Sequence, residues 1–386
     1  MFEIPKSDEK SNHETAKEKL ENDIKTLLDK ECGYLNAGFP RFMRLFGRDS
    51  LISSWQLLDL KPEISKATFE NLSTFQGRKF DDISEEEPGK ILHETHPKLS
   101  HHPKYDWIPF PYYGSVDSTP WFLIIFSKYI EKTGDQEFLN QHQQNIQLAV
   151  DWLETKINDD SSGFLRYQRK REKGQLFHQG WKDSFFDHLK IEPPVAIVEA
   201  QGYSYLGLKK AGQMLKNEKY NKLAEQLKNR FEEEFWMSDE EYFALALDGK
   251  NNQRQAITSN PGHLLFTEIL GKEKQDAVVR KLFSSELWTP YGIRSHGINE
   301  FDFDPESYHL GSVWPHDNWL IAQGLKKCGY QSEYQKVKEA ILTVNKELGY
   351  IPELYAVTRE EKLKEIPKAC TVQSWASGAA LQFITE

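Results

Sequence analysis

Residues 195–208 read VAIVEAQGYSYLGL, and residues 218–236 read EKYNKLAEQLKNRFEEEFW. Both stretches have the 3.6-residue periodicity of an α-helix, but their polarity differs. The first is apolar nearly all round, which is typical of a helix buried on most sides, whereas the second carries many charges and one apolar stripe. The two stretches therefore predict an inner helix followed by an outer helix that faces solvent.

This alternation repeats along the chain. Amphipathic segments are expected at 14–30, 49–59, 62–77, 118–134, 136–157, 194–216, 218–236, 260–270, 273–287, 313–328, 331–348 and 370–384. Short turns at 133–135 and 328–330 join members of a pair and predict antiparallel neighbours. Twelve helices that alternate between outer and inner layers predict an all-α fold, an (α/α)6 barrel or six-hairpin toroid, with short β-hairpins in loops such as 159–183 and 241–248.

A two-domain helical array is the alternative architecture. No Pro/Gly/Ser-rich linker divides the chain, so we expect residues 1–386 to form a single domain. The longer loops precede the inner helices and hold most of the Gly, Trp, His and Asp clusters. The starts of the inner helices are therefore expected to gather at one end of the barrel and to wall a pocket there.

Composition narrows the class of function. Lys and Arg total 49 against 59 Asp and Glu, a formal net charge of -10, and such a chain repels the phosphates of nucleic acids. Three distant cysteines form no CxxC pair, which argues against a disulfide framework or a zinc site and favours a reducing cytoplasm. The polar N-terminus does not resemble a signal peptide, and no stretch of about 18 apolar residues exists, so we expect no membrane partner.

Two carboxylates stand out in the aromatic-rich loops. Asp183 lies in HQGWKDS beside Trp181, and burial against an indole raises the pKa of a carboxyl group, as a general acid needs. Glu353 lies in IPELY between a Pro-fixed turn and Tyr355. Each could instead be a turn residue, just as Asp49 and Asp117 could be helix caps. Two carboxylates on separate loops at one barrel end nevertheless suit glycoside hydrolysis.

A metal or cofactor is not expected. His316 and Asp317 crowd one helix start, but no second His lies at a ligand spacing from them. The chain also contains no GxSxG, Walker or GxGxxG motif.

Several strings together resemble a known family. They are FGRDS (46–50), YYGSVDSTPWF (112–122), HQGWKDS (178–184), VEAQGYSYLGL (198–208), YHLGSVWPHDNWLIAQGL (308–325), IPELY (351–355) and CTVQSWASGAA (370–380). In this order they resemble the catalytic domain of amylo-α-1,6-glucosidase and glycogen-debranching-like glycoside hydrolases. More distantly, they are similar to mannosylglycerate and glucosylglycerate hydrolases and related α-glucosidases.

The resemblance implies an (α/α)6 barrel and hydrolysis with inversion, with Asp183 as general acid and Glu353 as general base. It also implies a sugar pocket lined by residues at motif positions: Arg48, Asp49, Asp117, Trp181, Lys182, Gln201, Trp314, His316, Asp317 and Trp375. Tyr113, Trp121 and His263 complete the candidate substrate-binding set.

The predicted function is that of an exo-acting, inverting α-glycosidase that hydrolyses an α-linked glucoside or a glucan end. A glycosylglycerate-type hydrolase is the alternative, because the chain is compact and lacks the large N-terminal domain common in debranching enzymes. A sugar epimerase or isomerase on the same barrel, with His178, His263 and His316 as its candidate acids and bases, is a further hypothesis. A carbohydrate substrate is the one partner expected, and the oligomeric state stays open.

Overall fold

The computed structural model describes residues 7–102, 104 and 107–386, with side chains described from residue 14 onward. Its helices are α1 (Ser7–Leu27), α2 (Gly47–Gln56), α3 (Pro62–Thr74), α4 (Ser118–Thr133), α5 (Gln136–Gln141), α6 (Gln143–Asp159), α7 (Val198–Leu215), α8 (Glu218–Phe235), the 3-10 helix η1 (Asn260–His263), α9 (Leu264–Thr267), α10 (Lys272–Leu282), α11 (Pro315–Cys328), α12 (Gln331–Leu348) and α13 (Ser374–Thr385).

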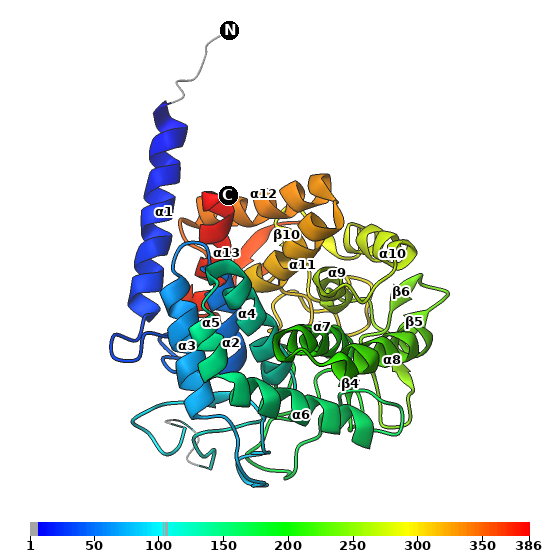
Figure 1. The fold of residues 1–386 in the computed structure, drawn as a ribbon. Helices are drawn as coiled ribbons and strands as arrows, with labels where there is room; N and C mark the ends of the chain where they lie inside the picture. Colours follow the sequence, from blue (N-terminus) through cyan, green and yellow to red (C-terminus); the bar gives the residue numbers. More distant parts are fainter. Residues whose placement is uncertain (1–6, 103, 105–106) are drawn as a thin grey trace.

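Six helices form a closed inner ring. Each contacts the next in the order α2, α4, α7, α9, α11 and α13, and α13 returns to α2. Figure 1 shows the red α13 beside the blue α2, so the last inner helix closes the ring against the first. The predicted (α/α)6 barrel is confirmed, and the predicted inner segments are the ones that form this ring.

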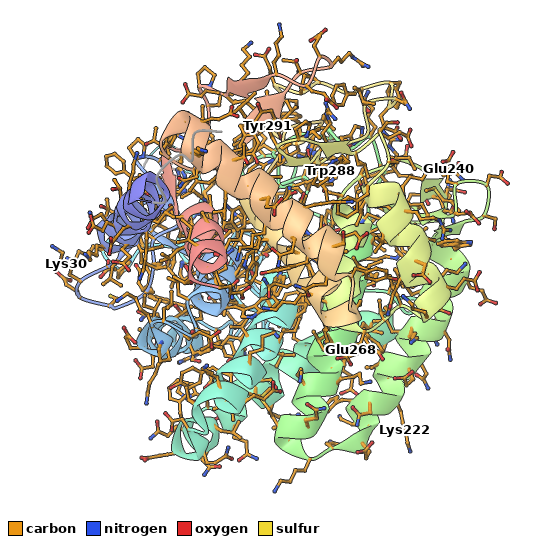
Figure 2. The ribbon with its side chains drawn as sticks, turned by 90° about the horizontal axis from the view of Figure 1, so that it is seen from above. Lys30, Lys222, Glu240, Glu268, Trp288 and Tyr291 are labelled. Atoms are coloured by element: carbon orange, nitrogen blue, oxygen red, sulfur yellow. The ribbon has the colours of Figure 1, made fainter. Side chains whose placement is uncertain are left out.

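The outer helices cover the ring. Helix α3 packs on α2 and α4, α6 on α4 and α7, α8 on α7, α10 on η1, α12 on α11 and α13, and α1 on α13. In α8, Tyr220, Leu223, Leu227 and Phe231 are buried at spacings of three or four residues, as an amphipathic helix requires. Lys222 of the same helix points outward at the periphery (Figure 2).

Short strands lie in the loops and pair with one another. They are β1 (Gly38–Phe39), β2 (Leu45–Phe46), β3 (Glu94–Thr95), β4 (Ala196–Ile197), β5 (Trp236–Met237), β6 (Tyr242–Phe243), β7 (Ala246–Leu247), β8 (Gln253–Arg254), β9 (Trp288–Thr289), β10 (Gly292–Ile293), β11 (Tyr355–Val357), β12 (Leu363–Glu365) and β13 (Val372–Gln373). All the pairs are antiparallel, and β1 pairs with β13 through Gly38 opposite Gln373. This pair joins the loop before the first inner helix to the loop before the last one.

Three expectations about individual elements were wrong in whole or in part. The segment 136–157 is not one helix, because the backbone breaks at His142 between α5 and α6. The segment 260–270 holds only η1 and the single turn of α9, because Glu268 adopts a left-handed conformation with φ of 67°. The loop 159–183 contains no strand and only single bridging residues at Tyr167 and His178, whereas 241–248 does contain β6 and β7.

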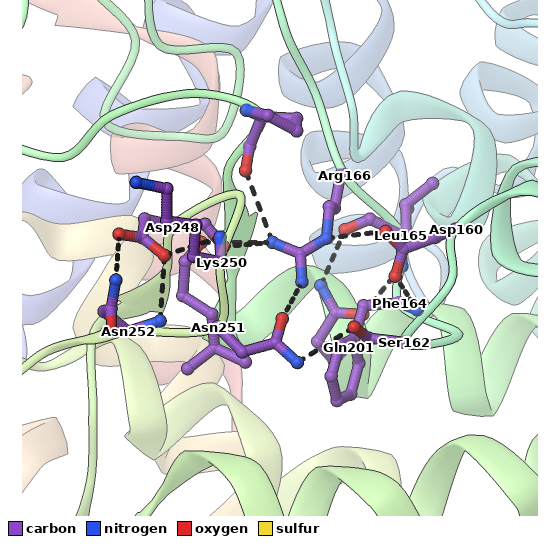
Figure 3. A network of polar contacts seen from close by, with 12 residues as sticks. Asp160, Ser162, Phe164, Leu165, Arg166, Gln201, Asp248, Lys250, Asn251 and Asn252 are labelled. Atoms are coloured by element: carbon purple, nitrogen blue, oxygen red, sulfur yellow. Dashed lines mark hydrogen bonds and ion pairs between the residues drawn. The ribbon is translucent and has the colours of Figure 1, made fainter.

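A half-buried polar network fixes the loop after α6 to the start of α7. The Arg166 guanidinium donates to Asp160 Oδ1 at 2.8 Å and to the carbonyl of Asp248 at 2.7 Å, and it also bonds Asn251 (Figure 3). The Gln201 amide accepts from the Leu165 N–H at 3.0 Å and donates to the Leu165 carbonyl at 2.8 Å. These contacts tie residues 160–166 to α7 and to the 248–251 turn.

Among the described residues, no helix is both long and apolar enough to cross a membrane.

Candidate active site

A pocket of about 550 Å³ opens at the barrel end where the inner helices begin. Its lining comes from the loops before α2, α4, α11 and α13 and from the loop that carries Asp183. Six residues predicted from the sequence line it: Asp49, Trp181, Asp183, Trp314, Glu353 and Trp375. The two predicted catalytic carboxylates therefore share one pocket, although 170 residues separate them in the chain.

Asp183 has the environment of a proton donor. About 33% of its side chain is exposed, and its Oδ2 accepts from Arg48 Nη1 at 3.2 Å. Burial raises the pKa of Asp183 from 3.8 to about 7. The Arg48 charge opposes this rise, whereas Asp117, Glu94 and Glu353 add to it. At neutral pH the carboxyl group therefore holds its proton for a large share of the time.

Glu353 has the environment of an anchored base. Its side chain is 3% exposed, and its Oε2 accepts from the Cys370 backbone N–H at 2.7 Å and lies 3.4 Å from Arg41 Nη2. The Tyr308 hydroxyl donates to Oε1. Burial raises the pKa of Glu353 above its ordinary value, and the Tyr308, Cys370 and Arg41 contacts limit the rise. The carboxylate is thus held in one orientation toward the pocket.

Asp49 is a third carboxyl group in the pocket. It lies in the first turn of α2, and Gln373 Nε2 donates to its Oδ1 at 3.2 Å. Burial raises the pKa of Asp49 to about 8; Arg48 opposes the shift, while Asp183 and Glu353 reinforce it. Asp49 is therefore mostly neutral at pH 7 and can donate a hydrogen bond as well as accept one.

Three tryptophans form an aromatic wall. Trp181 and Trp314 lie edge to face at 5.8 Å between ring centroids, and Trp375 stacks on His316 at 3.7 Å. The indole N–H groups of Trp181 and Trp375 have no hydrogen-bond partner among the described residues. They are placed to donate to hydroxyl groups of a bound sugar, and the ring faces suit its C–H groups.

A second set of predicted residues lies beneath this wall and does not line the pocket: Arg48, Asp117, Lys182, His263, His316 and Asp317. Arg48 pairs with Asp117 at 2.9 Å, His263 with Asp317 at 2.7 Å, and Lys182 donates to the Ser295 carbonyl at 2.6 Å. Burial lowers the pKa of Lys182 to about 8. These groups support the wall from behind.

The structure places three more predicted residues away from the pocket. Tyr113 donates to the Phe75 carbonyl at 2.6 Å, and Trp121 packs at 4.5 Å from Tyr203 inside the barrel. Gln201 binds the backbone of the 164–166 loop, as described above. A motif position alone does not distinguish a ligand-binding side chain from one that braces a loop.

The sequence interpretation missed much of the lining. The missed residues are Arg41, Phe42, Arg44, Phe46, His93, Glu94, His102, Tyr112, Leu176, Ser184, Phe185, Phe186, His188, Ser307, Tyr308, His309, Leu310, Lys368 and Gln373. Most lie within or beside the quoted motifs, so proximity to a motif was the available signal. His93, Glu94 and His102 are exceptions, because they lie in the long loop before α4, about ten or more residues from the nearest quoted motif.

One group of described residues has the composition of a metal site. Ligand atoms of His296, Glu300 and Asp302 lie within 4.8 Å of one another. However, Asp302 already pairs with Arg254 at 3.3 Å and with Lys190 at 3.5 Å. Two cations therefore balance the acidic charge, and the group offers little attraction for a third.

Solved structures match nearly the whole fold. The GH63 mannosylglycerate hydrolase from Thermus thermophilus in complex with Tris gives a TM-score of 0.74 at 13% identity and covers 96% of this chain and 100% of that chain. The complex with Tris and D-glycerate gives a TM-score of 0.75 at 13% identity, with the same coverage. At such low identity the likeness establishes the fold.

Sequence comparisons add a family signal over part of the chain. Residues 204–375 match the family described as mannosylglycerate hydrolase MGH1-like glycoside hydrolase domain. A mannosylglycerate hydrolase of Rubrobacter radiotolerans is 28% identical over 90 residues, which are 22% of this chain and 20% of the relative. Mannosylglycerate hydrolase MGH1 of Selaginella moellendorffii is 35% identical over 74 residues, 19% of this chain and 15% of the relative. The chain thus spans a fifth or less of the length of these curated relatives.

Together, the fold and these matches support a glycoside hydrolase of the (α/α)6-barrel class. Within that class, the named relatives are mannosylglycerate hydrolases, and this chain is similar to them. The comparisons support the glycoside hydrolase part of the predicted resemblance and do not single out glycogen debranching.

Proposed function

We propose that this protein is an inverting, exo-acting glycosidase that hydrolyses a small α-linked glycoside of the glycosylglycerate type. The observation that carries the proposal is the pair of carboxyl groups in one pocket, one with its pKa raised to about 7 and one anchored by three donors. Asp183 gives its proton to the glycosidic oxygen as the C–O bond breaks. Glu353 takes a proton from the water that attacks the anomeric carbon from the opposite face.

The positive charge at the pocket mouth favours a substrate that carries an anionic group. Arg41, with 42% of its side chain exposed, and the exposed Lys368 both line the pocket near Glu353. Arg44 also lines it, but its guanidinium is paired with Glu94. An arginine that is only partly engaged by a protein carboxylate suits a substrate carboxylate such as that of glycerate.

A substrate panel tests this proposal. Initial rates are measured on α-mannosylglycerate, α-glucosylglycerate, the matching glycerol glycosides, α-linked disaccharides and a branched dextrin. We expect kcat/KM to be higher for a glycerate glycoside than for its glycerol counterpart, and Arg41→Gln to remove this preference. Arg280→Gln, which alters an exposed arginine paired with Glu241, is the control. Faster hydrolysis of the branched dextrin would favour the glucan-end activity instead.

The three histidines named for the isomerase hypothesis are not placed to serve as its acids and bases. His178 lies between Tyr167 at 2.8 Å and Asp187 at 2.9 Å, and His263 between Tyr203 and Asp317. His316 lies beneath Trp375, and burial lowers its pKa well below the ordinary value. None of the three lines the pocket, so none is placed to move a proton on a free sugar.

A further inference from the structure

One guanidinium lies beneath the pocket between two carboxyl groups. Arg48 Nε donates to both oxygens of Asp117, at 2.9 and 3.1 Å, and Nη1 donates to Asp183 Oδ2 at 3.2 Å. The side chains of Arg48 and Asp117 are 2% and 1% exposed, whereas Asp183 faces the pocket. The geometry makes Asp117 the primary partner of Arg48 and Asp183 the weaker one.

Asp117 has no other evident task. It occupies the N-cap position of α4, yet its side chain makes no capping hydrogen bond to the helix. The Ser115 hydroxyl donates to Asp117 Oδ1 at 2.9 Å and keeps the carboxylate turned toward Arg48. A helix cap therefore does not explain why a charged residue is buried at this position.

Asp183 can keep its proton beside the Arg48 cation only if a second anion offsets that positive charge. A guanidinium next to a lone carboxylate lowers its pKa by about 1–3 units, which would strip the proton from a general acid at neutral pH. Asp117, Glu94 and Glu353 oppose this effect. Glu94 is already paired with Arg44, and Glu353 with Arg41, so Asp117 is the anion that shares the cation of Asp183.

The other titratable groups around this arrangement are mostly neutral. Asp49 holds a proton, as described above. Burial lowers the pKa values of His93, His309 and His316 well below the ordinary value, and the Arg48 charge lowers all three further. None of these histidines competes with Asp117 for the guanidinium.

We propose that Asp117 is a positioning residue that acts through Arg48 to keep the general acid Asp183 protonated before the reaction. The inference rests on the proposed function only in naming Asp183 as the acid. When Asp183 gives its proton to the leaving oxygen, it becomes a carboxylate, and Arg48 Nη1 is already in place to pair with it. The same guanidinium thus serves both protonation states.

The first test measures the protonation of Asp183 directly. Protein labelled with 13C at the aspartate carboxyl carbons is titrated by NMR, and the Asp183 signal is assigned from its loss in Asp183→Asn. We expect Asp117→Asn to lower the Asp183 pKa by about one unit or more, because the full Arg48 charge then faces Asp183. We expect Arg48→Gln to raise it. A merely structural loosening would not move the two variants in opposite directions.

A control disrupts a half-buried ion pair elsewhere in the molecule. Asp160→Asn breaks the Asp160–Arg166 contact at 2.8 Å, which lies outside the pocket lining (Figure 3). We expect this variant to leave the Asp183 titration unchanged. An unchanged Asp183 titration in folded Asp117→Asn overturns the proposal. If Asp117→Asn does not fold, an unchanged or lowered Asp183 pKa in Arg48→Gln overturns it.

Activity gives a second readout. In Asp117→Asn, the alkaline limb of the kcat/KM profile should move to lower pH by the shift that NMR reports. Hydrolysis of an α-glycosyl fluoride, whose leaving group needs little protonation, should fall less than hydrolysis of the O-glycoside. If the wild type releases no sugar from any glycoside, the proposed function fails, while the titration still decides the role of Asp117.

Discussion

At the scale of single residues, the same chemical group behaves differently at three positions of one pocket. Burial removes most of the water around the carboxyl groups of Asp49, Asp183 and Glu353. Asp183 keeps one face open to the pocket, whereas a backbone N–H and a tyrosine hydroxyl donate hydrogen bonds to Glu353. The neighbours thus favour a proton on Asp183 and a charge on Glu353. The sequence indicated both residues, but not the groups that separate their roles, because those groups come from distant loops.

Removing either carboxyl group should abolish turnover and spare the fold. Asp183→Asn and Glu353→Gln are each expected to lower kcat on an O-glycoside by on the order of 10²–10⁴-fold, the usual contribution of a general acid or base. Steady-state kinetics and circular dichroism check this expectation. Near-normal turnover by either folded variant would contradict the assigned role.

The pH dependence should be bell-shaped. Activity should fall above about pH 7, because Asp183 must hold its proton and its pKa is about 7. It should also fall on the acid side at a pH above the ordinary glutamate range, because Glu353 must be ionised and burial raises its pKa. The limbs of a kcat/KM profile report apparent values for the coupled groups. A profile that keeps rising beyond about pH 9 would be incompatible with Asp183 as the acid.

We expect Asp49 to lower the free energy of unfolding at neutral pH. The folded protein keeps its proton up to about pH 8, whereas the unfolded chain loses it near pH 4. Ionisation therefore favours the unfolded state increasingly between these values. Asp49→Asn removes the effect, so the Tm of the variant relative to wild type should rise from about pH 5 to about pH 8. A constant or shrinking Tm difference would show that Asp49 is ionised in the folded protein.

At the scale of elements, the starts of the inner helices place the chemistry. Asp49 lies in the first turn of α2, Trp314 precedes α11, and Trp375 lies at the start of α13. The sequence predicted this gathering because polar and aromatic clusters preceded each apolar helix. It could not predict the break at His142 or the left-handed turn that ends α9 at Glu268, because neither position is the Pro or Gly that usually signals an interruption.

Gln201 tests whether a motif position binds sugar or braces a loop. Gln201→Leu leaves the Leu165 N–H and carbonyl without their buried partner, which should cost about 1–3 kcal/mol of unfolding free energy. Urea denaturation measures the loss. KM should stay close to wild type in the folded variant. A raised KM with unchanged stability would instead place Gln201 at the substrate.

At the scale of the whole molecule, closure of the helix ring brings the two sides of the site together. The strand pair β1–β13 and the contact of α2 with α13 bring residues near 40 beside residues near 370. The alternating polarity predicted the two helix layers and the barrel, because the apolar residues of each segment indicate whether its helix is buried on one side or on most sides. Which loops meet across the pocket depends on how the helices are arranged around the closed ring. The positions of Arg41, Tyr308 and Lys368 in the pocket could therefore not be predicted from sequence alone.

The central claim is that Asp183 and Glu353 act from opposite faces of the anomeric carbon. The most direct measurement is ¹H NMR of wild-type hydrolysis of an α-glycosylglycerate, recorded before mutarotation scrambles the product. The account predicts that the β-anomer of the free sugar appears first. First release of the α-anomer would contradict it, because retention requires a carboxylate nucleophile in place of an activated water.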